Sequence, residues 1–180
     1  MYYSTKYDSS LIGPITLASD GESIVGLWLD GQKYHSSTIN GEVTTKDDMP
    51  VFIKTKEWLD KYFAGKNPSV DELPLAPCGS DFRKAVWDIL REIPYGECIT
   101  YGEIAKRIAA ETGQKTMSAQ AVGGAVGHNP ISIIIPCHRV IGANGSLTGY
   151  AGGIDKKITL LELEDVDLSR LTIPTRGTAL

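Results

Sequence analysis

The sequence predicts a mixed α+β fold in which a strand-and-helix region precedes a mostly helical one. In the first third of the chain, short apolar runs alternate with Asp-Gly turns, which is the pattern of β-hairpins. From about residue 80 onward, apolar side chains recur at helical spacing behind residues that favour helix starts. Between the two regions, Pro74, Pro77 and Gly79 interrupt the periodicity, so we expect an interdomain linker there.

The composition is that of an ordinary globular protein of one domain or two small ones. The chain has 180 residues, of which 42% are hydrophobic and 22% are charged, and this balance excludes intrinsic disorder. No apolar run approaches the ~18 residues that a membrane span needs. The start, MYYSTKYDSS, lacks the basic-then-apolar order of a secretion signal. We therefore expect a cytoplasmic protein with no membrane contact.

Charge and cysteine usage narrow the possible partners. The formal net charge is −4, from 18 Lys and Arg against 22 Asp and Glu, so any nucleic-acid role must use a local surface and not bulk electrostatics. Cys78, Cys98 and Cys137 cannot all pair within one chain, and reduced thiols fit best. Residues 1–77 contain no cysteine and only His35, so we predict no structural metal.

The elements of the first region follow from local pattern. Apolar runs at residues 15–18 and 24–29 precede Asp20-Gly21 and Asp30-Gly31, which predicts strands joined by hairpin turns. Residues 51–66 change to helical spacing, and Gly65 with the following Asn-Pro closes that segment.

The second region opens with a predicted helix that Ser80 caps and that ends by Pro94 and Gly96. The next helix has a capping box formed by Thr100 and Glu103, and it stops at Gly113. A further short helix follows a polar connection. Two short capped helices joined in this way are typical of a helix-turn-helix.

The second helix of this pair is almost bare. Ser118 can cap it and Asn129-Pro130 must end it, and small residues fill the interval: Ala119, Ala121, Gly123, Gly124, Ala125 and Gly127. Each interior glycine costs roughly 1 kcal/mol relative to alanine, so something large must approach this backbone. Close packing against another element is one interpretation. Approach to a nucleic-acid groove, with the few long side chains near the helix start making contact, is the other.

Residues 131–135 are apolar and β-branched, which is typical of a buried strand, and they lead directly into Pro136-Cys137-His138-Arg139. A nucleophilic sulfur must be a thiolate, and nearby His or Arg side chains lower its pKa. The alternative is an inert buried cysteine. Neighbouring residues in an extended segment point to opposite sides, so contact between Cys137 and His138 does not follow from their adjacency.

Downstream, GANGSLTGYAGG matches neither the P-loop nor the dinucleotide fingerprint. It is either a flexible turn or a pocket wall in which Tyr150 supplies an aromatic face. KKITLLELE then predicts a helix, and we expect an irregular tail after about residue 165. Glu164 is either a surface charge or an inward carboxylate that orients His138.

Taken together, three of these segments resemble a known protein family. IIIPCHRVIG, preceded by AVGGAVGHNP and followed by GYAGGIDKKITLLELE, is similar to the methylated-DNA–protein-cysteine methyltransferases, also called O6-alkylguanine-DNA alkyltransferases. The similarity covers about half of the chain, and PCHRV in this context is a specific signature. It implies a ribonuclease-H-like supporting domain at residues 1–75, a DNA-binding and alkyltransferase domain at 76–166, an irregular tail at 167–180, and no cofactor.

For the chemistry, the resemblance implies direct reversal of DNA damage by a protein that acts once. Cys137 would take the alkyl group from guanine O6 in double-stranded DNA and keep it as a thioether. The family pattern makes His138 the base, acting through a water, with Glu164 orienting it. Asn129 would hold the turn before the cysteine segment, and Arg139 would fix the framework of the site.

For the substrate, the resemblance places Tyr101 at a flipped guanine and Tyr150 at the pocket wall. The carbonyls of Cys137 and Val140 would accept from the exocyclic amine of the base, and the amide of Ala151 would approach O6. Extrusion of the nucleotide costs a few kcal/mol. The small residues around Tyr150 favour a pocket that tolerates groups larger than methyl, while activity on O4-methylthymine stays open.

The bare helix would lie against the minor groove through Ala121, Gly123 and Gly124, which accounts for both the glycines and the modest charge. The chain departs from the family at Gln120, where the family commonly places an intercalating arginine. Glutamine can hydrogen-bond an orphaned cytosine but lacks the charge and stacking plane of arginine, so we predict weaker base flipping.

Two other functions stay open. A binding module of the same architecture would recognise alkylated bases without repair, although Cys137 argues against it. A cysteine hydrolase built on Cys137 and His138 would need an oxyanion hole and would leave the bare helix unexplained. Single-turnover repair needs only a monomer, which is the state that we expect.

Overall fold

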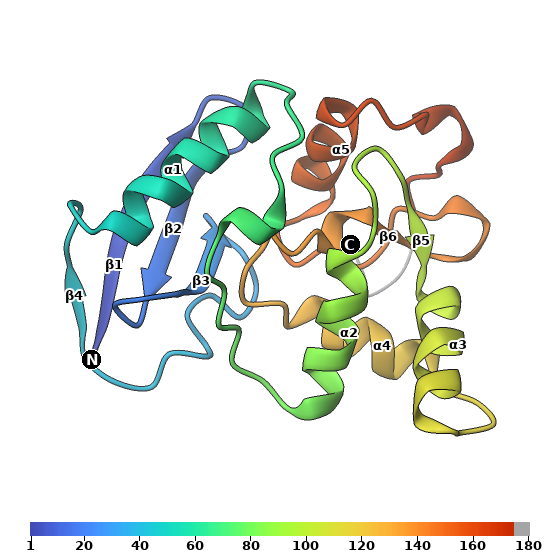
Figure 1. Cartoon of the computed structure of the whole chain (residues 1–180). Helices are drawn as coiled ribbons and strands as arrows, with labels where there is room; N and C mark the ends of the chain where they lie inside the picture. Colours follow the sequence, from blue (N-terminus) through green and yellow to red (C-terminus); the bar gives the residue numbers. More distant parts are fainter. Residues whose placement is uncertain (175–180) are drawn as a thin grey trace.

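The N-terminal part of the computed structural model, which describes residues 1–174, is a four-stranded sheet with one helix packed on it (Figure 1). The strands are β1 (Tyr2–Ser9), β2 (Gly13–Ser19), β3 (Ile24–Leu29) and β4 (Val43–Thr45), in the order β3-β2-β1-β4. Neighbours are antiparallel except for β1 and β4. The predicted hairpin around residues 20–21 is confirmed, whereas Asp30-Gly31 leads into a long loop and not into a hairpin strand.

Helix α1 (Pro50–Phe63) lies over β1 and β2. Pro50 suits its first turn because that position needs no backbone N–H partner. Phe52, Leu59 and Tyr62 are among the residues on its buried face. The helix ends near Gly65, whose φ of +72° lies in the region that favours glycine. The helix predicted from spacing is therefore confirmed, with its end a few residues earlier.

The segment expected to be an interdomain linker is bonded to the sheet. It contains a short 3-10 turn, η1 (Val70–Glu72), and then runs beside β3. The Ile24 amide donates to the Pro74 carbonyl at 2.8 Å, and the Ala76 amide donates to the Ile24 carbonyl at 2.9 Å. The prolines break helical periodicity here, but the chain remains part of the sheet edge.

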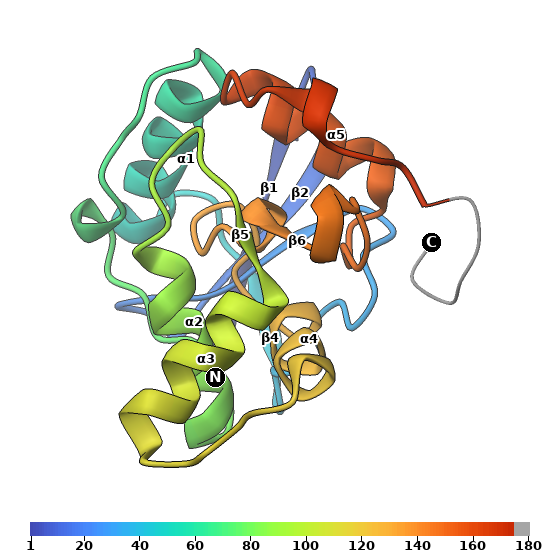
Figure 2. The ribbon, with the colours of Figure 1, turned by 90° about the vertical axis from the view of Figure 1, so that its right-hand side faces the viewer.

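The C-terminal part consists of α2 (Asp81–Arg91), α3 (Tyr101–Thr112), α4 (Ala119–Gly127) and α5 (Ile154–Leu163), shown from the side in Figure 2. The predicted caps are confirmed at Ser80 and Ser118, and Thr100 forms its capping box with Glu103. Helices α2, α3 and α4 pack on one another. A two-stranded parallel pair, β5 (Ile99–Thr100) with β6 (Val140–Ile141), ties the start of α3 to the segment after Cys137.

The strand predicted at residues 131–135 is wrong. The segment folds back on itself, with the Ile135 amide donating to the Ile131 carbonyl at 3.0 Å, and only a single bridge joins Ile131 to Leu27. Ile133 has a φ of +69°, which is rare and strained for a β-branched residue. A run of isoleucines indicates that a segment is buried, but a buried segment can form turns as well as a strand.

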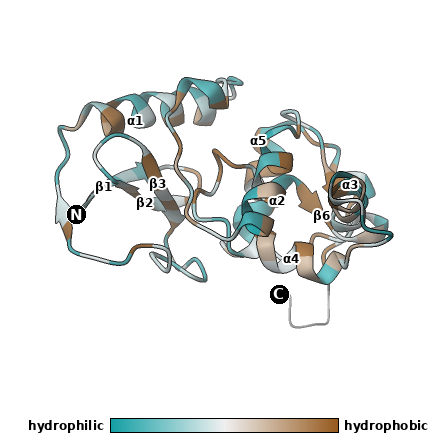
Figure 3. Cartoon of the chain, turned by 60° about the horizontal axis from the view of Figure 1, so that its bottom comes forward, coloured by the Kyte–Doolittle hydropathy of each residue, from teal (hydrophilic) through white to brown (hydrophobic). Residues whose placement is uncertain are grey.

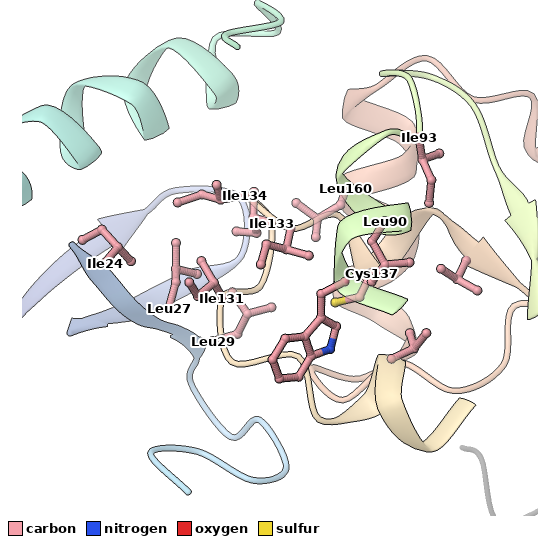
Figure 4. Close-up of a cluster of buried hydrophobic side chains, with 14 of the residues drawn as sticks. Ile24, Leu27, Leu29, Leu90, Ile93, Ile131, Ile133, Ile134, Cys137 and Leu160 are labelled. Atoms are coloured by element: carbon pink, nitrogen blue, oxygen red, sulfur yellow. The ribbon is translucent and has the colours of Figure 1, made fainter. Parts of the chain in front are cut away.

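One hydrophobic cluster joins the two parts (Figure 4). Leu27 and Leu29 from β3 lie beside Ile131, and the cluster continues to Leu90 and Cys137. Backbone bonds reinforce the contact, because the Leu27 amide donates to the Pro130 carbonyl at 2.8 Å. The sheet therefore supports the segment that carries the cysteine.

After α5 the chain forms a short 3-10 turn, η4 (Leu168–Arg170), and a bridge between Ser146 and Thr172. Of the tail expected at 167–180, residues 175–180 lie outside the described residues. Within residues 1–174, none of the helices combines the length and the apolar character that a bilayer crossing requires.

Candidate active site

Cys137 begins a 3-10 turn, η2 (Cys137–Arg139), and its side chain is only 4% exposed. Its sulfur lies among the side chains of the shared core (Figure 4). Burial raises the pKa of the Cys137 thiol, while a hydrogen bond with Asn129 and the charge of Lys157 oppose that rise in part. The thiol is therefore neutral at rest, so a base must remove its proton before it attacks an electrophile.

Glu164 turns inward and is the centre of a buried network. His138 Nε2 lies 2.6 Å from its Oε1, and the Tyr62 hydroxyl donates to the same oxygen at 2.6 Å. Arg139 donates to both carboxylate oxygens, at 2.8 and 3.0 Å. Burial alone would raise the pKa of Glu164, but the bonds from His138 and Arg139 outweigh it and hold the pKa well below its usual range. The carboxylate is charged and its charge is matched by Arg139.

This network sets the tautomer of His138. A ring nitrogen 2.6 Å from a charged carboxylate carries the proton, so Nε2–H donates to Glu164 and Nδ1 keeps its lone pair. Burial lowers the pKa of His138 despite the favourable carboxylate. Nδ1 is buried and has no hydrogen-bond partner among the described residues. The imidazole is therefore neutral and presents an unoccupied basic nitrogen, as a general base requires.

Arg139 belongs to the framework of the site. Its Nη1 donates to the Ile93 carbonyl at 2.6 Å, and its guanidinium lies 5.7 Å from the ring centre of Tyr95. Because its remaining donors bind Glu164, it does not serve the thiol as a neighbouring cation. The cation that does act on Cys137 is Lys157, a residue that the sequence analysis did not single out.

Asn129 holds the fold of the segment before the cysteine. Its Nδ2 donates to the Ile135 carbonyl at 2.8 Å, and its Oδ1 accepts from the Ile131 amide at 3.0 Å. These bonds bring the two ends of the isoleucine run together, which explains why the run turns back and does not extend.

Two tyrosines flank the thiol. The Tyr101 hydroxyl donates to the carbonyls of Thr148 and Gly149, at 3.1 and 3.3 Å. Tyr150 is 7% exposed, and its hydroxyl has no partner within residues 1–174. Both phenols lie near Cys137, and burial raises the pKa of each. Both are therefore neutral. The Tyr101 proton is already given to the loop carbonyls, whereas the Tyr150 hydroxyl can still donate a hydrogen bond at the site.

Backbone carbonyls at the positions expected to meet a base already have partners within the chain. The Cys137 carbonyl accepts from the Val140 amide, and the Val140 carbonyl accepts from Lys157 Nζ. Each carbonyl has a second lone pair that can accept. The Ala151 carbonyl accepts from the Lys33 amide at 3.0 Å, which ties the glycine-rich loop to the N-terminal part.

Helix α4 presents a bare surface. It appears in pale colours in Figure 3, as expected for small residues. A Cβ built on Gly123 would only touch the Tyr101 ring at 3.8 Å, and one on Gly124 or Gly127 would meet no described atom within 4 Å. Packing inside the described chain therefore does not require these glycines, which favours the second interpretation, an external partner. Gln120 and Ala121 are exposed on the same helix.

A hollow of about 540 Å³ lies between α3, α4 and the glycine-rich loop. Its lining includes Tyr101, Gln120, Gly123 and Gly149. Tyr101 connects this hollow to the site, because it lines the hollow and its phenol also lies near the Cys137 thiol.

Sequence reasoning missed two residues of the site, Tyr62 and Lys157. Tyr62 lies on the apolar face of an amphipathic helix and so counted as core. Lys157 occurs in a lysine pair that is typical of a solvated helix start, although its side chain is fully buried. No cluster of three or more His, Cys, Asp or Glu side chains suited to a metal occurs within the described part of the chain.

Comparison with known proteins shows which family the chain belongs to. The family model "6-O-methylguanine DNA methyltransferase, ribonuclease-like domain" matches residues 1–77, and the model of the DNA binding domain of the same family matches residues 81–166. The chain belongs to the 6-O-methylguanine DNA methyltransferase family. The α+β fold with a ribonuclease-like N-terminal part, expected from the sequence, is confirmed.

Relatives within this methyltransferase family match almost the whole chain. The methylated-DNA–protein-cysteine methyltransferase of Haemophilus influenzae is 43% identical over 92% of this chain and 87% of its own length. That of Methanosarcina acetivorans is 47% identical over 91% and 98%. The crystal structure of Mycobacterium tuberculosis OGT in complex with DNA is 44% identical, with a TM-score of 0.76 over 94% of each chain.

Proposed function

We propose that this chain is a methylated-DNA–protein-cysteine methyltransferase that repairs DNA by moving the alkyl group of O6-methylguanine onto Cys137. The observation that carries the proposal is the relay between Glu164 and His138, the residue that follows Cys137 in the chain. A neutral imidazole is fixed through Nε2 by a charged Glu164 and offers Nδ1 as a base. Family membership supplies the reaction class, and the buried thiol supplies the acceptor.

In the proposed reaction, His138 takes the thiol proton through a bridging water. The resulting thiolate attacks the alkyl carbon, so that a sulfur–carbon bond forms while the bond from that carbon to guanine O6 breaks. The guanine gains a proton and returns to its ordinary form. Glu164 stabilises the imidazolium that results, and Arg139 with Tyr62 holds the carboxylate in place. A thioether does not exchange as a disulfide does, so each molecule acts once.

We propose that the DNA partner is a duplex bound at its minor groove by α4. The open space over Gly124 and Gly127 supports close approach of a sugar-phosphate backbone. Gln120 would enter the stack that the flipped guanine leaves, with Ala121 and Gly123 against the groove. The base would enter beside Tyr101 and meet Tyr150, the carbonyls of Cys137 and Val140, and the amide of Ala151.

The domain roles and the working form are part of this proposal. Residues 1–75 would support the site, residues 76–166 would bind DNA and transfer the alkyl group, and the protein would act as a monomer without a cofactor. The three cysteines are free, which suits the reducing cytoplasm. The small residues around Tyr150 favour a pocket that accepts alkyl groups larger than methyl.

The test is the intact mass of the protein after mixing with a duplex that contains O6-methylguanine. We expect a gain of one methyl group per molecule, located on Cys137, and no gain in Cys137→Ser. Cys78→Ser is the matched control and should still gain the methyl group, because Cys78 is exposed and far from the relay in sequence. DNA binding without a mass gain would instead support a recognition module, and repeated turnover of an ester would support a hydrolase.

A further inference from the structure

The loop that follows β3 reaches the end of the bare helix α4. The ring of Tyr34 stacks on the ring of His128, with 3.9 Å between the ring centres and 21° between the planes, and Figure 2 shows the loop beside α4. His128 directly follows the last residue of α4, and its Nδ1 lies 2.7 Å from the Gly124 carbonyl. Because a carbonyl can only accept, Nδ1–H donates, and this bond fixes the imidazole against the helix. Tyr34 therefore rests on a rigid support.

The stack lies on the bare side of α4. Residues four apart share one face of a helix, so His128 continues the row formed by Gln120 and Gly124. The buried side chains of α4 belong to its other side: Val122, Ala125 and Val126. Tyr34 itself is 51% exposed, although His128 covers one face of its ring. An open aromatic ring from the N-terminal part thus extends the exposed row of α4.

Anchors to the C-terminal part hold the loop in this position. The Lys33 amide donates to the Ala151 carbonyl at 3.0 Å. Gln32 is buried, and its Oε1 accepts from the Ser132 hydroxyl at 3.0 Å. Tyr34 has a φ of +60°, a conformation that is unfavourable for a bulky residue and persists only where the surroundings enforce it. The loop is therefore fixed on the C-terminal part by several independent contacts.

The loop also brings positive charge to this face. Lys33 is exposed and forms no salt bridge within residues 1–174. The carboxylate nearest to Lys33 in the sequence is that of Asp30, and Lys156, whose Nζ donates to the Asp30 carbonyl, adds a second cation beside it. Most protein–DNA hydrogen bonds go to phosphate and sugar groups, and lysine is a frequent donor. Lys33 is therefore available to an external anion such as phosphate.

A duplex seated on α4 must pass this corner of the molecule. With 9 residues at about 1.5 Å each, α4 is about 13 Å long, whereas the minor groove is about 6 Å wide. If the helix lies along the groove, the duplex continues past its end. If the helix lies across the groove, a row of phosphates lies over each end. In both orientations DNA passes the end of α4 that Lys33 and Tyr34 flank.

We propose that Lys33 and Tyr34 extend the DNA-binding face of α4 onto the N-terminal part. Lys33 contacts a phosphate of the duplex, and the ring of Tyr34, supported by His128, packs against the neighbouring deoxyribose. The N-terminal part then binds DNA directly, in addition to supporting the site. This inference rests on the proposed function in taking duplex DNA as the partner of α4.

The test measures the affinity of the whole chain for a short fluorescent duplex without a lesion, by anisotropy, over a series of salt concentrations. One phosphate contact contributes about 0.9 to the slope of log affinity against log salt, so the loss of affinity in Lys33→Met should shrink about eightfold for each tenfold rise in salt. Lys54→Met is the matched control, because Lys54 is an exposed lysine on α1, and its slope should equal that of the wild type.

Tyr34→Gly removes the ring without a change of charge, and glycine suits the φ of +60°, so the variant should fold, as circular dichroism can verify. It should bind the duplex more weakly at every salt concentration, with an unchanged slope, whereas Tyr34→Phe keeps the stacked ring and should bind like the wild type. A wild-type slope in Lys33→Met, or wild-type affinity in Tyr34→Gly, overturns the proposal. The duplex carries no lesion, so DNA binding that depends on Lys33 but comes without methyl transfer in the mass assay would refute the proposed function alone.

Discussion

Replacement of Tyr62 by phenylalanine removes one hydrogen bond from the carboxylate at the centre of the site. The Tyr62 hydroxyl donates to a charged, buried Glu164 at 2.6 Å. Bonds to charged groups contribute about 1.5–3 kcal/mol to folding, against about 0.5–1.5 kcal/mol for neutral ones. Tyr95→Phe is the matched control, because the Tyr95 hydroxyl donates to the neutral Leu163 carbonyl at 3.0 Å. We expect Tyr62→Phe to lower the free energy of unfolding by about 1 kcal/mol more than Tyr95→Phe does.

The cost of Tyr62→Phe depends on pH with a definite sign. The pKa of Glu164 is depressed in the folded state, so its stabilisation is present above its unfolded pKa of about 4.3 and is lost as pH falls toward the folded value. Tyr62→Phe makes the depression smaller. The destabilisation is therefore complete at neutral pH, and it shrinks only well below pH 4, once the pH falls through the folded pKa of the variant, whose carboxylate is protonated before that of the wild type.

Urea unfolding followed by circular dichroism, at several pH values from neutral to acidic, measures both quantities. Tyr95→Phe should show a smaller loss that changes little over the same range. Equal losses in the two variants at neutral pH, or a Tyr62→Phe loss that grows on acidification, would show that Tyr62 does not stabilise the charged form of Glu164.

Three further predictions concern helix α4 and the cysteine segment. Gly124→Ala should raise the free energy of unfolding by up to about 1 kcal/mol, because its Cβ has open space, yet weaken binding to duplex DNA in a titration; unchanged DNA affinity would remove Gly124 from the interface. Gln120→Ala should slow methyl transfer from duplex more than from the free base, and Gln120→Arg should accelerate transfer from duplex; equal rates in all three proteins would exclude an intercalating role. Asn129→Ala leaves the Ile131 amide and the Ile135 carbonyl without their side-chain partner, so it should cost about 2–4 kcal/mol in urea unfolding, and a loss below 1 kcal/mol would contradict its structural role.

Local sequence signals were sufficient to predict the helices and the residues at which they begin and end. Ser80, Thr100 with Glu103, and Ser118 cap helices because their side chains bond backbone amides a few residues away, and such bonds depend little on the rest of the fold. The β-branched run at 131–135 failed as a strand prediction because its conformation is set by Asn129 and by contact with Leu27, which lies about a hundred residues earlier.

The candidate site, too, could be predicted from the sequence only in part. The sequence places Cys137 and His138 together, and the resemblance assigns their partners. Whether Glu164 faces inward depends on Arg139 and Tyr62, which neutralise and bind it from two other segments. Lys157 carried no recognisable pattern, since a buried polar residue is recognised only once its partners are known.

Tyr62, His138 and Glu164 meet in one network, although the ribosome synthesises their segments at very different times. Tyr62 emerges early, Cys137 and His138 much later, and Glu164 later still, so a nascent chain carries its sulfur and imidazole before it carries the carboxylate that fixes the imidazole. Translation must pass the last turn of α5 before the site can assemble. A chain that ends before Glu164 therefore lacks the carboxylate that His138, Arg139 and Tyr62 bind.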